Sequence, residues 1–205
     1  MAKGVVKFGG SNLKSSCDIA KIVQVVRLYG RELVIVVSAL YGVTDVLLDS
    51  LLRARTDTDA LDRVRRRVLP SYARIVAEYV PGHRKKEVKQ QPETRVTELE
   101  KYLLGIHCLG DIPCFVRDRV LSFGERLSSL TITAVLNASG IPCRECLPEE
   151  LGLLTNGSYS NASVAFNQCR QRVRARLGQC KTRAITAVAR LSASGPICWP
   201  GTRFI

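Results

Sequence analysis

Apolar residues in the first forty positions follow two different spacings. A short apolar run ends at Phe8, and a continuous, mostly β-branched run covers Leu33–Val37, as in a strand buried on both faces. Between them, apolar residues recur every three or four positions, at Ile19, Ile22, Val23 and Val26. That spacing predicts a helix with Ser15 or Ser16 as its N-cap and Gly30 as its end. Strand, helix and strand in this order predict a right-handed βαβ unit with two parallel strands.

The spacing farther along predicts a helical block and a return to the sheet. Helices are expected over 43–54 and over 57–79, the second with a kink or break at Pro70. A polar, basic loop is expected over 81–91, before an amphipathic helix that starts at Pro92-Glu93.

A further helix is expected to start near Gly124 and to end at Gly140. It is followed by a short strand over 141–143, a helix over 162–177 and a strand over 183–189. The whole pattern predicts an α/β protein, a three-layer sandwich in which a mainly parallel sheet lies between helices.

Length and hydrophobicity favour one globular unit. The chain has 205 residues, of which 46% are hydrophobic, enough to bury a sizeable core. No apolar run approaches the length of a membrane span, and Lys7 with Gly9 and Gly10 interrupts any signal-peptide pattern. We therefore expect a cytoplasmic protein with no membrane partner.

Charge and cysteines change this picture little. The formal net charge is +13, with arginine clusters at 63–67 and 170–176, but no aromatic residues alternate with them. We therefore interpret the clusters as solvated helix faces and do not expect nucleic acid as a partner. Eight scattered cysteines in a chain without a secretion signal favour reduced thiols. The single C-x-x-C at 143–146 has no second pair at zinc-ligand spacing, so no metal site is predicted.

Candidate chemistry begins where the first predicted strand ends. Lys7 closes the strand, and Gly9, Gly10 and Ser11 follow before a helix. Glycines let the backbone approach an anion, and the next helix would present free N–H groups, so this order predicts a phosphate site. Lys7 would add a point charge for a transferring phosphoryl group; the alternative is an exposed lysine at a strand end.

Four motifs in order resemble those of the aspartokinases, in the amino acid kinase family. They are Lys7–Asn12, Val36–Ala39, Gly42–Asp45 and Ser122–Ser128. The resemblance covers roughly residues 3–185. It implies ATP-dependent phosphorylation of the side-chain carboxylate of L-aspartate to 4-phospho-L-aspartate, with Mg²⁺ on the phosphates. This is the entry step to lysine, diaminopimelate, threonine and methionine synthesis.

The resemblance also implies roles for single residues. Ser38 and Thr44 would contact the substrate aspartate, and Glu125 would bind its amino group. By position alone, Ser38 and Thr44 could equally be capping hydroxyls, and Glu125 a first-turn acid favoured by the helix dipole. Arg126 and Ser128 are interpreted as structural support, and Tyr72 as packing.

The end of the chain departs from the family pattern. The family continues with a glycine-phenylalanine turn and a G-R-G-G-S-D stretch, whereas residues 191–205 form an atypical tail. We expect residues 1–190 to correspond to the N-terminal part of an amino acid kinase catalytic domain, truncated or frameshifted near 184–190, without an ACT regulatory domain. The alternatives are a non-catalytic remnant, another amino acid kinase and a basic binding protein. Whether copies form a homo-oligomer stays open.

Overall fold

Within the residues that the structure describes, four parallel strands form one sheet. The computed structural model describes residues 4–29, 32–159, 161–180 and 184–188. The strands are β1 (Gly4–Phe8), β2 (Leu33–Val37), β3 (Cys143–Cys146) and β4 (Ala184–Val188), in the order β1-β2-β4-β3. Each neighbouring pair is parallel, so all four strands end at the same edge of the sheet. The predicted βαβ unit is confirmed at its first two strands.

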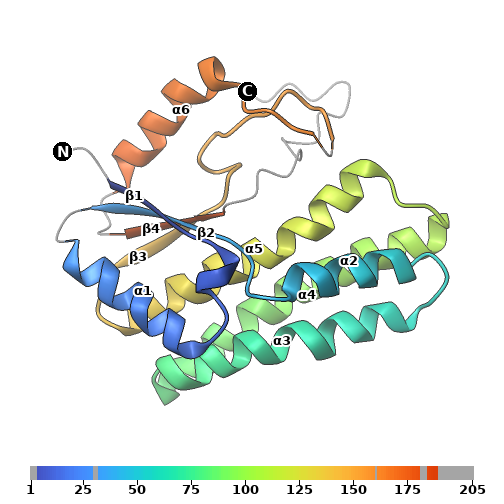
Figure 1. Ribbon diagram of the computed structural model, residues 1–205, viewed down its shortest axis with the longest axis horizontal. Coiled ribbons are helices and arrows are strands. Elements are labelled where there is room, and N and C mark those ends of the chain that lie inside the picture. The colour runs from blue at the N-terminus through green and yellow to red at the C-terminus, as the bar shows by residue number, and fades with distance from the viewer. Residues whose placement is uncertain (1–3, 30–31, 160, 181–183, 189–205) are drawn as a thin grey trace.

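Six α-helices accompany the sheet in the described ranges. They are α1 (Ser16–Leu28), α2 (Val43–Arg53), α3 (Asp59–Tyr79), α4 (Gly82–Leu109), α5 (Cys114–Ala138) and α6 (Phe166–Gln179). Helices α1 and α5 cover one face of the sheet and α6 covers the other, which gives the predicted three layers (Figure 1).

Alternation along β2 assigns its side chains to the two faces. Leu33, Ile35 and Val37 belong to the large core shared with α1 and α5, whereas Val34 joins a small cluster with Ile185 under α6. The strand is therefore buried on both faces, as its continuous apolar sequence predicts.

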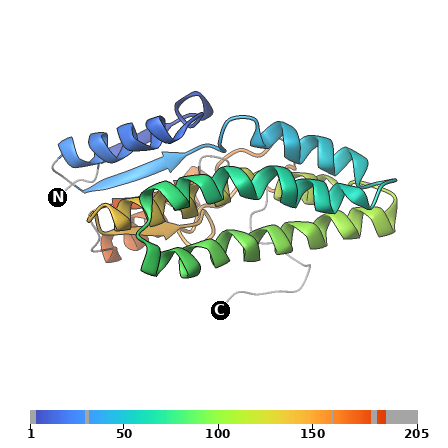
Figure 2. The same ribbon diagram turned by 90° about the horizontal axis from the view of Figure 1, so that it is seen from below.

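Helices α2, α3 and α4 form a block that projects from the sheet beside the first half of α5. Figure 2 shows α3 and α4 running side by side, and α5 packs against both of them and against α2. The block lies at the edge where the strands end, because α2 follows β2 after only a short loop. Helix α3 continues through Pro70, so the expected break there does not occur.

The predicted loop over 81–91 is wrong. Helix α4 begins at Gly82 and continues through Pro92, which is buried. Lys, Gln, Glu and Arg in this stretch are strong helix formers, and half-buried Val88 continues the apolar stripe upstream of Pro92 by one helical turn. The proline removes one backbone hydrogen bond, but packing against α3 maintains the helix.

The predicted helix start near Gly124 is also wrong. Helix α5 begins at Cys114, after Pro113, so Gly124 and Glu125 lie in its interior. Glu125 therefore receives no stabilisation from a helix N-terminus, and its interpretation as a first-turn acid fails.

Other boundaries shift by a few residues. The third strand covers Cys143–Cys146 rather than 141–143, and α6 begins at Phe166 rather than 162. The predicted tail over 191–205 lies outside the described residues.

Candidate functional site at the carboxyl edge of the sheet

Two loops lie together where β1 and β2 end. The Ser38 N–H donates to the Phe8 carbonyl at 3.1 Å, and the Tyr41 N–H donates to the Leu13 carbonyl at 3.1 Å. Between these bonds, a Cβ added to Gly10 would lie 3.5 Å from the Ala39 carbonyl oxygen. The glycine loop after β1 and the loop after β2 are therefore fixed side by side, as expected for consecutive parallel strands.

The glycine loop does not lead directly into helix α1. Gly10–Asn12 form a 3₁₀ turn, and α1 begins at Ser16 behind its N-cap Ser15. One Asp18 carboxylate oxygen accepts hydrogen bonds from the Lys14 and Ser15 N–H groups, at 3.2 and 3.1 Å. The Ser15 hydroxyl and the Lys21 ammonium also bond this carboxylate and hold the pKa of Asp18 below its usual value.

The start of α1 is thus occupied by a carboxylate of its own chain. A phosphate at this edge would meet Gly9, Gly10 and Ser11 in the 3₁₀ turn rather than the helix N-terminus. Ser11 is exposed, and its hydroxyl contacts the Asn12 side-chain oxygen at 3.2 Å.

Lys7 lies exposed near the end of β1. It pairs in register with Val36, two residues before Ser38. Phe8 enters the large core, so alternation directs Lys7 to the opposite face, which is the α6 side of the sheet. The structure thus gives Lys7 a solvent-accessible position beside the loop after β2, and its phosphate role stays a prediction.

Gly124 brings helix α5 against the loop after β2. A Cβ added to Gly124 would lie 2.7 Å from the Ala39 Cβ and 3.4 Å from side-chain carbons of Val43 and Leu47. Only glycine permits this approach without movement of the loop or α2. Glu125, the next residue, is 7% exposed and is therefore buried next to this contact. Three predicted residues, Ser38, Thr44 and Glu125, therefore belong to segments that meet at this contact.

Neither predicted hydroxyl caps helix α2. The N-cap is Gly42 at φ 78°, and no side-chain cap is formed. Ser38 directly follows β2, and half-buried Thr44 is the second residue of α2. Among the described residues, the Ser38 and Thr44 hydroxyls form no hydrogen bond that caps α2.

Tyr72 also lies at this contact, where its burial agrees with the packing interpretation, but its hydrogen bond there was not predicted. Its fully buried hydroxyl donates to the Gly124 carbonyl at 3.0 Å and lies 3.4 Å from the Ser128 hydroxyl. Burial raises the pKa of Tyr72 well above its ordinary value, and the nearby Glu125 charge raises it further. Nothing in the sequence signals this contact, because it depends on the packing of α3 against α5.

Arg126 and Ser128 support the fold around Glu125. The Arg126 guanidinium pairs with Glu149 at 2.7 Å and bonds the Ser122 hydroxyl at 3.3 Å. The Ser128 hydroxyl donates to the Gly124 carbonyl at 3.0 Å. These bonds lie within α5 or join it to the segment after β3, in agreement with the structural interpretation.

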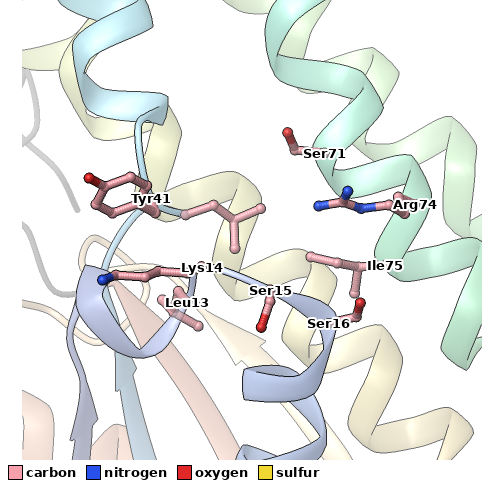
Figure 3. A pocket seen from close by; sticks show the side chains of 9 residues that line it. Leu13, Lys14, Ser15, Ser16, Tyr41, Ser71, Arg74 and Ile75 are labelled. Carbon is pink, nitrogen blue, oxygen red and sulfur yellow. The ribbon is translucent and has the colours of Figure 1, made fainter.

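A small pocket opens on the other side of the loop after β2, between the start of α1 and α3. Its volume is about 30 Å³, far below the about 300–1,000 Å³ of ligand sites. Figure 3 shows that its polar groups do not converge: the Lys14 ammonium turns away beneath the Tyr41 ring, and the Ser71 hydroxyl points out of the hollow. The pocket suits ordered water rather than a substrate.

The part of the chain that the structure describes contains neither a cluster of metal ligands nor a membrane-spanning helix. No three His, Cys, Asp or Glu side chains gather as a metal site there. None of its helices is long and apolar enough to cross a membrane.

Known proteins agree with this architecture. The chain is 28% identical over 171 residues to aspartokinase 1, chloroplastic, of Arabidopsis thaliana; the match covers 78% of this chain and 28% of that protein. It is 21% identical over 191 residues to the bifunctional aspartokinase/homoserine dehydrogenase 1, chloroplastic, of Zea mays, covering 93% of this chain and 21% of that protein.

Solved structures show the same fold. Aspartokinase III of E. coli, in complex with aspartate and ADP, superposes with a TM-score of 0.74 at 17% identity, over 91% of this chain and 40% of that one. Its complex with lysine and aspartate gives 0.73 at 16% identity, over 90% and 40%. This chain thus spans well under half the length of these relatives. The sequence model of the amino acid kinase family matches residues 3–197, and the protein therefore belongs to that family.

Proposed function

We propose that this protein acts at the carboxylate of a small amino acid, with ATP as phosphoryl donor and L-aspartate as acceptor. The observation that carries the proposal is the contact between Gly124 and Ala39, which joins buried Glu125 to the loop bearing Ser38. The aspartokinases among its relatives support aspartate as the acceptor, and the ADP complex of the E. coli enzyme supports a nucleotide donor. The product would be 4-phospho-L-aspartate, the entry compound of lysine and diaminopimelate synthesis.

Each residue has a definite part in this proposal. Glu125 binds the ammonium group of aspartate, where burial strengthens the charge pairing. Ser38 and Thr44 donate hydrogen bonds that orient the substrate carboxylates. A side-chain carboxylate oxygen attacks the γ-phosphorus, the bond to the β,γ-bridging oxygen breaks, and ADP leaves. Lys7 neutralises charge on the transferring group, and the turn of Gly9, Gly10 and Ser11 receives phosphate oxygens.

Magnesium enters this reaction with the nucleotide. The described residues offer no cluster of three carboxylate, histidine or cysteine ligands, so they do not fit a resident metal site. Mg²⁺ commonly keeps several waters and binds through substrate phosphates, which requires few protein ligands.

The test is formation of aspartyl hydroxamate from ATP, Mg²⁺, L-aspartate and hydroxylamine, which traps the acyl phosphate. Lys7→Ala should lower the rate about a hundredfold, because charge stabilisation of the transition state is lost. Lys21→Ala is the matched control: its side chain is 73% exposed, pairs with Asp18 at 3.3 Å and has no part in the proposed reaction. Equal losses in both variants would contradict the role of Lys7.

Glu125→Gln separates substrate binding from chemistry. We expect the KM for aspartate to rise at least about tenfold, because a charge-assisted bond to the ammonium group is lost. Glu78→Gln, on the exposed surface of α3, is the matched control.

Calorimetric titration with aspartate then separates the remaining alternatives. Binding without turnover in a folded chain would support the non-catalytic remnant. Neither binding nor turnover, in a chain whose cooperative unfolding shows that it is folded, would reject the proposed function.

A further inference from the structure

A pocket of about 530 Å³ is lined by residues of the first half of α6 and of the segment before it. Helix α6 lies on the side of the sheet opposite α1 and α5 (Figure 1). The pocket lining includes the apolar residues Leu153, Val164, Phe166 and Val173. The pocket also has two exposed arginines in its lining, Arg170 and Arg174, called the rim arginines below. Its size falls within the range of about 300–1,000 Å³ typical of small-molecule sites. The residues assigned to the proposed kinase reaction do not line it.

The pocket residues of α6 share one helix face. Phe166, Arg170 and Val173 are spaced by four and three residues, and Arg174 lies one turn beyond Arg170. Phe166 is 76% exposed, so the pocket lining includes a large ring that is mostly open to solvent. An apolar ligand would cover this ring and the adjoining aliphatic side chains, removing them from water.

The two rim arginines lack acidic neighbours. Helix α6 contains no Asp or Glu, and among the described residues no carboxylate pairs with Arg170 or Arg174. Like charges four residues apart on a helix repel each other, so an anion between them relieves a repulsion. Guanidinium groups also match the geometry of a carboxylate.

We propose that this pocket binds a single-chain amphiphilic anion of the fatty-acid type. The hydrocarbon chain lies against Phe166, Val164 and Val173, and the carboxylate pairs with Arg170 and Arg174. The apolar lining argues against a wholly polar metabolite, and the presence of two arginines without an acidic partner in that lining argues against a neutral lipid. This site is independent of the proposed kinase reaction, and the experiments below test it separately.

The test is calorimetric titration of the full chain with decanoate at low salt, below the concentration at which decanoate forms micelles. Saturable binding with about one site per chain is expected, together with a negative heat-capacity change from apolar burial. Decanol, titrated in the same way, measures the contribution of the ligand's hydrocarbon chain alone. Inorganic phosphate measures the contribution of negative charge alone. Each should bind at least about tenfold more weakly than decanoate.

The chain supplies a matched pair of variants. Arg170→Gln/Arg174→Gln removes the two rim charges and should weaken decanoate binding about tenfold. Arg172→Gln/Arg176→Gln makes the same charge change on the same helix, but neither residue lines the pocket. Its effect should stay within roughly twofold, from long-range electrostatics alone. Phe166→Ala should weaken binding to decanoate and leave the unfolding transition in place.

Four outcomes would overturn the proposal. The first is the absence of saturable decanoate binding to the wild-type chain, and the second is decanol binding as tightly as decanoate. The third is an equal loss of decanoate affinity in the two double arginine variants. The third would indicate a general polyanion surface, as for nucleic acid. The fourth is a concentration-dependent dimer, seen by sedimentation, that Phe166→Ala dissociates, since a second copy would then occupy the pocket.

Discussion

The two faces of the sheet are covered in very different ways. On one face, α1, α5 and the helical block share a continuous core that extends from Phe8 to Cys143. On the other, the described residues that α6 covers form a small buried cluster of Val34, Cys146, Leu151 and Ile185. The predicted Glu125 and Thr44 belong to the densely packed side, whereas the 530 Å³ pocket belongs to the sparsely covered one.

This difference shows how packing divides the molecule. A buried carboxylate such as Glu125 keeps its orientation only where its surroundings are fixed, and Gly124, Ala39 and Tyr72 fix them from three segments. Among the described residues, the α6 side buries a much smaller cluster, and the ring of Phe166 stays 76% exposed there. It is therefore suited to a ligand that completes its surface, and it should tolerate substitutions that the other side cannot.

The largest expected contrast comes from one aromatic residue on each side. Tyr72→Ala removes a fully buried ring and should cost about 3–5 kcal/mol of unfolding free energy. Phe166→Ala removes a ring that is 76% exposed and should change stability by less than about 0.5 kcal/mol. Urea unfolding followed by circular dichroism measures both. Similar costs for the two variants would show that the two faces are equally packed, contrary to the comparison.

A glycine pair tests the contact between α5 and the loop after β2. Gly124→Ala places a Cβ 2.7 Å from the Ala39 Cβ and should destabilise the protein by about 1–3 kcal/mol through overpacking. Gly105→Ala, inside α4, meets nothing within 4 Å and should stabilise by up to about 1 kcal/mol through helix propensity. The opposite signs of the two changes, measured by urea unfolding, are the essential result. A gain in stability in both variants would mean that the loop after β2 moves away from α5 at little cost in free energy.

The hydroxyl of Tyr72 should contribute a smaller, pH-dependent share. Tyr72→Phe should cost about 1 kcal/mol near pH 8, because the bond to the Gly124 carbonyl is lost. The folded state holds the pKa of Tyr72 above the unfolded value of about 10. Above that pH the unfolded chain releases a proton that the folded chain retains, so wild-type stability falls as the pH rises. The difference in unfolding free energy between the wild type and Tyr72→Phe should therefore become smaller above about pH 10. A constant difference across this range would contradict the raised pKa.

The parts of the fold predicted from sequence are those set by local pattern. Leu33–Val37 is too short and too apolar for anything but a buried strand, and Ser15, one of the two predicted N-caps, is the N-cap of α1. Once two parallel strands were predicted, the loops after Phe8 and Val37 had to meet at one edge, where the structure has them hydrogen-bonded.

The failures occur where tertiary packing overrides local signals. Pro92 indicated a helix start, yet α4 passes through it because its apolar stripe packs on α3. Gly124 indicated a boundary, yet its lack of a side chain serves a close approach inside α5. The Tyr72 contact joins residues 52 positions apart, so no local pattern contains it.

The smallest expected effect concerns the attachment of the segment after β3 to α6. The Leu154 N–H donates to the Cys169 sulfur at 3.0 Å, and Cys169 is buried. Cys169→Ala leaves this N–H without its partner and should cost about 1 kcal/mol or less. Hydrogen exchange should quicken at Leu154 and its neighbours, while the amide of Ser38, on the other side of the comparison, stays protected. Cys108→Ala, at an exposed position in α4, is the matched control and should alter neither. Faster exchange at Ser38 would mean that the two faces open as one cooperative unit, and the α6 side could then not rearrange around a ligand without disturbing the residues around Glu125.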